Sequence, residues 1–310
     1  MNAAPLKVMV LAGGPDHERE VSLASGESVA AGLVEAGHEV RRSDVMPQEL
    51  SVLNAFEAWG GDVIFPALHG AWGEGGGLQR VLDQRGLRYV GSSAAAAELA
   101  MDKHRSKLVF ENHGVPTPAF ELIRPGERPG MEPPVVVKPH DEGSSIGVHI
   151  CHNEAAISRA CAALAGQHRN LLIERYIEGR ELTVGLLGGG AQRGGYDILP
   201  ALEVVPAAGF YDYEAKYHRN DTTYRFDLDL PSSLIEQLGQ SALRAHQALG
   251  CRHLSRVDFI VDREHRLWCL EVNTMPGFTS HSLLPKAAAK AGIHWPQLLD
   301  RLVRLPLSHR

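Results

Sequence analysis

Cysteine is scarce in this chain and is not arranged for metal binding or disulfide formation. The 310 residues contain four cysteines, Cys151, Cys161, Cys251 and Cys269, and no C-x-x-C pair. Zinc ribbons and the disulfide frameworks of small secreted domains need closely spaced cysteines, so neither is indicated. We therefore expect a reduced, cytoplasmic setting.

The chain also lacks a long apolar run and an excess of positive charge. The N-terminal apolar segment, residues 8–12, is too short for a signal-peptide core, and no run approaches the length of a membrane span. The formal net charge of −6 argues against broad binding to nucleic acid or to anionic membranes. We expect neither among the partners.

Two common nucleotide-binding signatures are missing as well. No G-x-x-x-x-G-K-[ST] loop occurs, and Gly13-Gly14 after the first apolar segment is not part of a G-x-G-x-x-G motif. The remaining composition, 44% apolar and 22% charged, is ordinary for a protein with buried cores. A length of 310 residues predicts two or three domains.

Two alternating apolar segments, residues 256–262 and 267–273, flank a polar break and predict a β-hairpin. Pairing centred on that break places Arg256 opposite Asn273 and Asp258 opposite Glu271, with all four side chains on one face. The opposite face is expected to be core and carries Val257, Phe259, Val261, Trp268, Leu270 and Val272.

The two acids of this hairpin need an explanation, because carboxylates directly opposite one another repel. A bound divalent cation would relieve the repulsion. Mg²⁺ fits best, since it is held by few carboxylates and completed by substrate phosphates. The alternative is a solvated polar face that tolerates the clash, and the spacing alone leaves both interpretations open.

The first hundred residues alternate strand-like and helical segments, which predicts a parallel-sheet unit. The strands are expected at 8–11, 38–42, 63–68 and 88–90, and the helices at 22–36, 76–85 and 93–100. Ligands of such sheets bind at the carboxyl ends of strands. Two loops lie there. The first loop holds Glu18, which could equally be an ordinary acid in the first turn of a helix. The second loop, residues 68–77, is glycine-rich, and a flexible surface loop would have the same composition.

Two later segments also have the character of ligand-binding loops. The apolar run 135–137 ends at Lys138 and leads into the Gly/Ser-rich turn 139–147, followed by a strand expected at 146–150. Backbone N–H groups, two hydroxyls and a lysine can cradle an anion, although a plain turn is the alternative. The aperiodic, aromatic segment 210–221 predicts a lid or a packed loop.

Eight segments, in the same order and spanning nearly the whole chain, resemble the D-alanine–D-alanine ligase family of ATP-grasp enzymes. They are GGPDHEREVS (13–22), LHGAWGEGGGLQ (68–79), MDKHRSK (101–107), VVVKPHDEGSSIGV (135–148), IERYIEGRELTV (173–184), FYDYEAKY (210–217), RVDF (256–259) and LEVNTMPGFTSHSLLP (270–285). The resemblance implies an α/β fold of ATP-grasp architecture. A parallel α/β (pre-ATP-grasp) domain at 1–98 would precede two α+β ATP-grasp subdomains at 99–184 and 185–310, with ATP between those two.

The implied reaction joins two D-alanines into D-alanyl-D-alanine, a peptidoglycan precursor, with release of ADP and phosphate. A carboxylate is a poor acyl donor, so ATP would first convert it into a D-alanyl phosphate. Two alternatives stay open. One is a depsipeptide ligase joining D-alanine to D-lactate, against which Tyr217 argues. The other is a non-catalytic, ATP-binding regulatory protein, against which the complete set of metal ligands argues.

The resemblance also implies roles for particular residues. Two Mg²⁺ ions, for which Mn²⁺ can substitute, would be held by Asp258, Glu271 and Asn273. The residues expected to contact ATP are Lys103, Lys138, Ser145, Glu174, Tyr176, Ile177, Glu181 and Lys216.

The remaining implied roles concern D-alanine and the closed state of the site. Arg256 and the Gly277 N–H would stabilise the tetrahedral oxyanion. Ser282 and the Leu283 N–H would hold the second carboxylate at a helix N-terminus. The first ammonium would pair with Glu18, and a set formed by Glu18, Ser144 and Tyr217 would shut out water. His69 and Glu74 are further candidates for substrate contact, and a homodimer is expected because the family is often dimeric.

Overall fold

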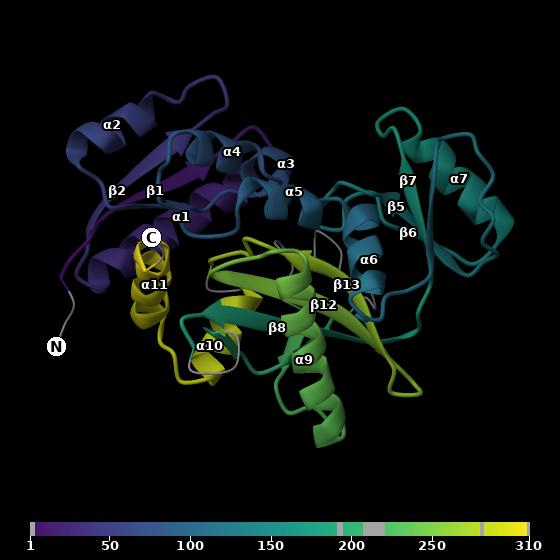
Figure 1. The fold of residues 1–310 in the computed structure, drawn as a ribbon. Helices are drawn as coiled ribbons and strands as arrows, with labels where there is room; N and C mark the ends of the chain where they lie inside the picture. The colour runs from purple at the N-terminus through teal and green to yellow at the C-terminus, as the bar shows by residue number, and fades with distance from the viewer. Residues whose placement is uncertain (1–3, 191–194, 207–220, 280–281, 309–310) are drawn as a thin grey trace.

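The structure, a computed structural model, describes residues 4–190, 195–206, 221–279 and 282–308. Three β-sheets lie along the chain, and helices cover or connect them (Figure 1). No helix in these ranges is long and apolar enough to cross a membrane.

The first sheet is parallel, as the strand–helix alternation predicts. Its order is β2-β1-β3, formed by β1 (Lys7–Gly13), β2 (Glu39–Val45) and β3 (Val63–Pro66). The connections are helical: α1 (Arg19–Glu35) and α2 (Ser51–Trp59). The strand expected at 88–90 makes only an isolated bridge between Tyr89 and Ile64. Glu18 is the N-cap residue of α1, so the parallel sheet presents it at the carboxyl end of β1.

A series of short helices leads away from the first sheet. It comprises α3 (Gly70–Gly73), α4 (Gly77–Gln84), α5 (Ala94–Met101) and α6 (Lys103–Asn112). The helix expected at 93–100 is α5, and Asp102 separates it from α6. The Asp102 carboxylate accepts from the Arg105 N–H at 3.0 Å and caps α6. Lys103 is therefore the first residue of a new helix.

The second sheet is four-stranded and antiparallel. Its order is β4-β7-β5-β6, formed by β4 (Phe120–Ile123), β7 (Leu171–Arg175), β5 (Val135–Pro139) and β6 (His149–Cys151). Helix α7 (Glu154–Leu164) packs against β5 and β6. The strand expected at 146–150 begins only at His149, because Ser144, Ser145 and Gly147 have φ of 51°, 59° and 68°. Left-handed backbone cannot continue a β-ladder.

The third sheet is the largest, in the order β11-β10-β8-β12-β13, with β9 paired to β8. Its strands are β8 (Gly179–Gly188), β9 (Tyr196–Ile198), β10 (Leu202–Val205), β11 (Thr223–Arg225), β12 (Leu254–Asp262) and β13 (Leu267–Asn273). Helix α9 (Ser232–Ala248) lies against it, and Pro231 occupies its N-cap position.

The hairpin β12–β13 pairs Arg256 with Asn273 and Asp258 with Glu271, so its predicted register is confirmed. The register then shifts, and Phe259 faces Cys269. One extra residue in a strand reverses the faces beyond it. Cys269 is consequently core, and the prediction that Trp268 and Leu270 belong to the core is wrong; Leu270 lines a pocket instead.

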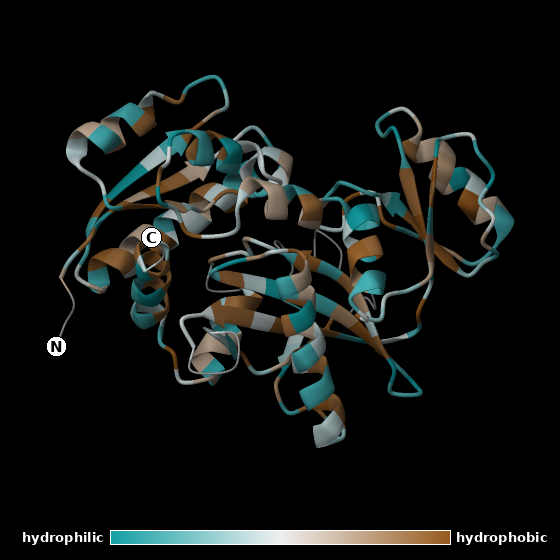
Figure 2. Cartoon of the chain, in the orientation of Figure 1, coloured by the Kyte–Doolittle hydropathy of each residue, from teal (hydrophilic) through white to brown (hydrophobic). Residues whose placement is uncertain are grey.

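The apolar side chains form separate cores, and one of them joins the two ends of the chain. Val10 of β1 packs in the same cluster as Leu284 of α10 (Leu283–Lys290) and Leu299 of α11 (Trp295–Arg304), just before the terminal 3₁₀ turn η2 (Leu305–Leu307). The four-stranded sheet buries its side chains with α7 in another cluster. Figure 2 shows apolar residues concentrated along these strands, whereas the helices alternate in hydropathy.

Candidate active site

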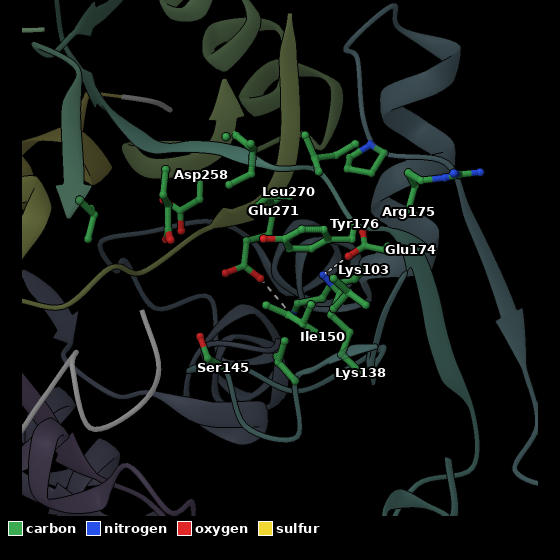
Figure 3. Close-up of a pocket in the computed structure, with 18 of the residues that line it drawn as sticks. Lys103, Lys138, Ser145, Ile150, Glu174, Arg175, Tyr176, Asp258, Leu270 and Glu271 are labelled. Carbon is green, nitrogen blue, oxygen red and sulfur yellow. Dashed lines mark ion pairs between the residues drawn. The ribbon is translucent and has the colours of Figure 1, made fainter. Parts of the chain in front are cut away.

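Two cavities meet at the Glu271 side chain. The larger, about 380 Å³, lies between the four-stranded sheet and the third sheet, and we call it the nucleotide pocket (Figure 3). The smaller, about 80 Å³, lies between the loop before α1 and the loop after β13, and we call it the substrate cleft. Glu271 lines both, so the hairpin β12–β13 forms the boundary between them.

The nucleotide pocket brings together residues that are far apart in the sequence. Of the expected ATP contacts, the structure places Lys103, Lys138, Ser145, Glu174, Tyr176, Ile177 and Glu181 in its lining. Lys216 lies outside the described residues. The apolar walls include Val136, Ile150 and the displaced Leu270. A pocket whose lining combines apolar side chains with charged groups suits an adenine base followed by phosphates.

Glu174 is the most deeply buried acid of this pocket, with 2% of its surface exposed. Its two carboxylate oxygens form ion pairs with two ammonium groups, those of Lys107 and Lys138. Burial opposes ionisation of Glu174, but the two lysines hold its pKa below the usual value. The sequence analysis missed Lys107. Its spacing of four residues from Lys103 in a helix could have indicated a shared face.

Lys103 ties the Gly/Ser-rich turn to the hairpin. Its ammonium donates to the Glu142 carbonyl at 2.5 Å and lies 3.2 Å from Glu271 Oε2. Its backbone N–H donates to the His140 carbonyl at 2.7 Å. The start of α6 thus connects the second and third sheets at the point where the two cavities meet.

Each of the two acids expected to bind metal, Asp258 and Glu271, has a cationic side chain beside it. Arg256 donates to both oxygens of Asp258, at 2.9 and 2.7 Å, and Lys103 lies beside Glu271. The Thr183 hydroxyl, at 2.6 Å, and the Asn273 amide, at 3.0 Å, also donate to Asp258. The repulsion is therefore relieved by neighbouring cations, an explanation that the sequence analysis did not consider.

The donor set itself fits Mg²⁺. Asp258, Glu271 and Asn273 offer two carboxylates and an amide oxygen on one face of a hairpin, beside a pocket that would supply phosphate oxygens. Within the described ranges, no group of three or more His, Cys, Asp or Glu side chains could hold a metal. A site made by protein ligands alone is thus not indicated there, whereas one shared with a phosphorylated ligand is.

The substrate cleft collects the other expected residues. Glu18, His69, Glu74, Ser144, Arg256, Gly277, Ser282 and Leu283 all line it, whereas Tyr217 lies outside the described residues. The Ser144 hydroxyl donates to Glu18, which links the turn of the second sheet to the first sheet. A Cβ on Gly277 would lie only 2.7 Å from Ser282 Oγ, so the loop requires glycine for this close approach.

His69 and Glu74 form a buried pair next to Glu18. His69 Nδ1 lies 4.0 Å from Glu74 Oε2, and the Gly70 N–H donates to Glu74 Oε1 at 3.3 Å. Burial works against protonation of His69, but Glu74 and Glu18 together raise its pKa. Burial raises the pKa of Glu74. The cleft is therefore rich in acids and retains protons readily.

Comparison with known proteins places this geometry in a family. The model of the family described as "D-ala D-ala ligase C-terminus" matches residues 110–304. A D-alanine–D-alanine ligase from Bordetella avium is 42% identical over 299 residues, which cover 94% of this chain and 92% of that protein. The chain belongs to the D-alanine–D-alanine ligase family.

Further relatives support the family assignment. The Marinobacter nauticus ligase is 43% identical over 97% of this chain and 91% of that protein. The crystal structure of a family member from Bacillus anthracis, described as complexed with ATP, aligns with a TM-score of 0.83 and 31% identity over 98% of both chains. The VanG D-Ala:D-Ser ligase of Enterococcus faecalis has the same fold, with a TM-score of 0.83 at 24% identity.

Proposed function

We propose that this chain is an ATP-dependent ligase that joins two D-alanines into D-alanyl-D-alanine for peptidoglycan synthesis, with ADP and phosphate as the other products. The observation that carries the proposal is the meeting of the two cavities at Glu271 in a member of this family. A nucleotide in one cavity and an amino acid in the other would place a phosphate beside a carboxylate. That juxtaposition is what carboxylate activation requires.

The chain's own residues account for the first half of the reaction. Glu18, buried in the acid-rich cleft, would pair with the ammonium of the first D-alanine. The carboxylate oxygen of that D-alanine would attack the γ-phosphorus of ATP, so the carboxyl–phosphate bond of D-alanyl phosphate forms and ADP leaves. Lys103 and Lys138, with Lys216 from outside the described residues, would orient the phosphates. The Ser144–Ser145 turn would cover them.

The second half is an attack by the amine of the second D-alanine on the D-alanyl phosphate. Arg256 and the Gly277 N–H would stabilise the oxyanion. Ser282 and Leu283, at the N-terminus of α10, would hold the second carboxylate. The amine loses a proton, the new amide bond forms and phosphate leaves. The hydrogen bond between Ser144 and Glu18 would keep water from the acyl phosphate, and Tyr217 would contribute to the same closure.

The nucleotide would occupy the nucleotide pocket, and the metal ions would lie where the two cavities meet. Two Mg²⁺ ions, or Mn²⁺, would be held by Asp258, Glu271 and Asn273 and would supply neutralisation of phosphate charge. The carboxylates would then exchange contacts with Arg256 and Lys103 for contacts with metal. The base and ribose would be contacted by Glu174, Tyr176, Ile177 and Glu181.

The identity of the second substrate is the part of the proposal most open to test, because the Enterococcus faecalis relative of the same fold is described as a D-Ala:D-Ser ligase. We expect ADP release, measured by a coupled assay, with D-alanine alone. We expect none with L-alanine alone, and no depsipeptide when D-lactate is added. ATP binding without any D-alanine-dependent ADP release would support the non-catalytic regulatory protein, and a D-alanyl-D-lactate product would support the depsipeptide alternative.

Three broader features belong to the same proposal. The domain boundaries would be 1–98, 99–184 and 185–310. A cytoplasmic location is supported by the four cysteines, all of which are buried free thiols. A homodimer is proposed from the family alone, and the sedimentation coefficient of the purified chain tests it.

A further inference from the structure

Lys107 is one of the largest fully buried side chains, and the proposed mechanism gives it no role. Its ammonium pairs with one oxygen of Glu174 and donates to Thr117 Oγ1 at 2.5 Å. Thr117 in turn donates to the Cys269 carbonyl of β13 at 2.8 Å. Lys107 is therefore fixed in place by α6, by the segment before β4 and by the hairpin that carries Glu271.

Its position relative to the nucleotide pocket is the important point. Glu174 and Lys138 line the pocket, whereas Lys107 is absent from the lining and lies behind Glu174. The carboxylate is thus held between an inner lysine and an outer lysine. Only the outer one can meet a ligand.

The charges of Lys107, Lys138 and Glu174, taken together, suggest a function for Lys107. Burial lowers the pKa of Lys107 and Glu174 opposes that shift, and with both lysines protonated the two ammonium groups and one carboxylate leave a net single positive charge. Because Lys107 neutralises Glu174 from the buried side, the surplus charge belongs to Lys138, which faces the pocket. Without Lys107, Lys138 and Glu174 would neutralise each other, and the pocket would lose the surplus positive charge that attracts a phosphate.

We propose that Lys107 is a positioning residue that neutralises Glu174 from behind and so leaves a surplus positive charge on Lys138, at the pocket, for a nucleotide phosphate. The inference rests on the proposed ATP site. It adds a residue that does not touch the nucleotide and acts through the charge of another side chain.

A purely structural role for Lys107 makes a different prediction. Truncating one partner of a buried ion pair leaves an uncompensated charge and costs stability. Such damage would weaken every ligand of the pocket alike. The proposed role is specific to phosphate, so comparing ATP with adenosine, which lacks phosphates, separates the two explanations.

The test is calorimetric titration of ATP and of adenosine, with Mg²⁺ present, into the wild-type chain, K107M and R105M. Arg105 is exposed on the same helix, so R105M removes one positive charge without touching Glu174. We expect K107M to weaken ATP binding about tenfold, the size of one charge-assisted contact, and adenosine binding by less than about twofold. R105M should change neither.

Adding E174Q supplies the control for folding and for the charge mechanism. In an E174Q background Lys138 no longer has the Glu174 carboxylate as a partner. K107M should therefore change the ratio of ATP to adenosine affinity by less than about twofold there. A tenfold further loss of ATP affinity relative to adenosine affinity there would overturn the proposal, and this comparison remains available if K107M alone does not fold. In the K107M single variant, an unchanged ratio would also overturn it.

The wild-type titration distinguishes this failure from failure of the proposed function. If the wild-type chain binds no ATP, the ligase proposal falls and the inference falls with it. If wild type binds ATP and K107M binds ATP and adenosine in the wild-type ratio, only the role of Lys107 is wrong.

Discussion

The most deeply buried carboxylate of the nucleotide pocket is compensated differently from the carboxylates of the substrate cleft. In the pocket, two lysines, one in the lining and one behind it, pair with the single carboxylate of Glu174. In the cleft, Glu18, Glu74 and Glu271 outnumber Arg256. Charges inside a protein interact far more strongly than in water. The same residue type can thus prepare one cavity for phosphates and its neighbour for an ammonium group.

The two cavities also differ in what holds their walls together. The cleft is built on the core that joins the first sheet to α10 and α11, reinforced by a hydrogen bond between His38 Nε2 and Asp300 at 3.0 Å. The walls of the pocket belong to two different cores. Polar contacts such as Lys103 to Glu271 and Lys107 to Glu174 cross between them. Charge substitutions should therefore affect the two cavities differently.

Substitution of Glu271 should affect both cavities, because this residue lines both. We expect E271Q to lower kcat about 100- to 1000-fold, since a ligand of the metal that would neutralise phosphate charge is lost. Steady-state rates at increasing Mg²⁺ measure the effect, and the melting temperature checks the fold. E264Q, at the exposed turn of the same hairpin, is the matched control. Wild-type turnover of E271Q at saturating Mg²⁺ would refute the metal assignment.

Substitution of Glu18 should affect the substrate cleft and leave the nucleotide pocket unchanged, because Glu18 lines only the cleft. We expect E18Q to raise KM for the first D-alanine about tenfold through loss of a charge-assisted contact with the ammonium. The Kd of ATP should remain as in wild type. E20Q, exposed in the first turn of the same helix, serves as control. An equal loss of ATP affinity in E18Q would mean that the two cavities are not electrostatically independent.

The smallest expected effect concerns the proton held in the cleft. The pKa of His69 is raised above 6.5 in the fold, so its contribution to stability is complete below that pH and is lost as pH rises through the folded pKa. The raised pKa of Glu74 acts in the same direction. Between about pH 6 and pH 9 we expect a fall in melting temperature of about 2 °C.

Thermal scans across that pH range, compared with H69Q, check this expectation. The fall should be smaller in H69Q and unchanged in H17Q, a control at an exposed histidine. A steeper fall in H69Q than in wild type would show that the cleft does not retain its proton through His69.

Local patterns in the sequence were sufficient for much of the fold. Alternation of apolar residues fixed the hairpin and the pairing of Asp258 with Glu271. The helices expected at 22–36 and 76–85 appear as α1 and α4. These features depend on periodicity and on capping within one element. The bulge that moved Leu270 into the nucleotide pocket has no such local signal, because its position is set by pairing between strands.

By itself, the sequence determined the strand and helix periods, the family and a list of candidate site residues, because these are carried by neighbouring positions and by ordered motifs. Only the tertiary structure decided which charges compensate one another. Lys107 meets Glu174 across 67 positions of the chain, and Lys103 meets Glu271 across 168. Ion pairs of this kind form only when separate elements are packed together, and the energy of a charge depends on what surrounds it in space.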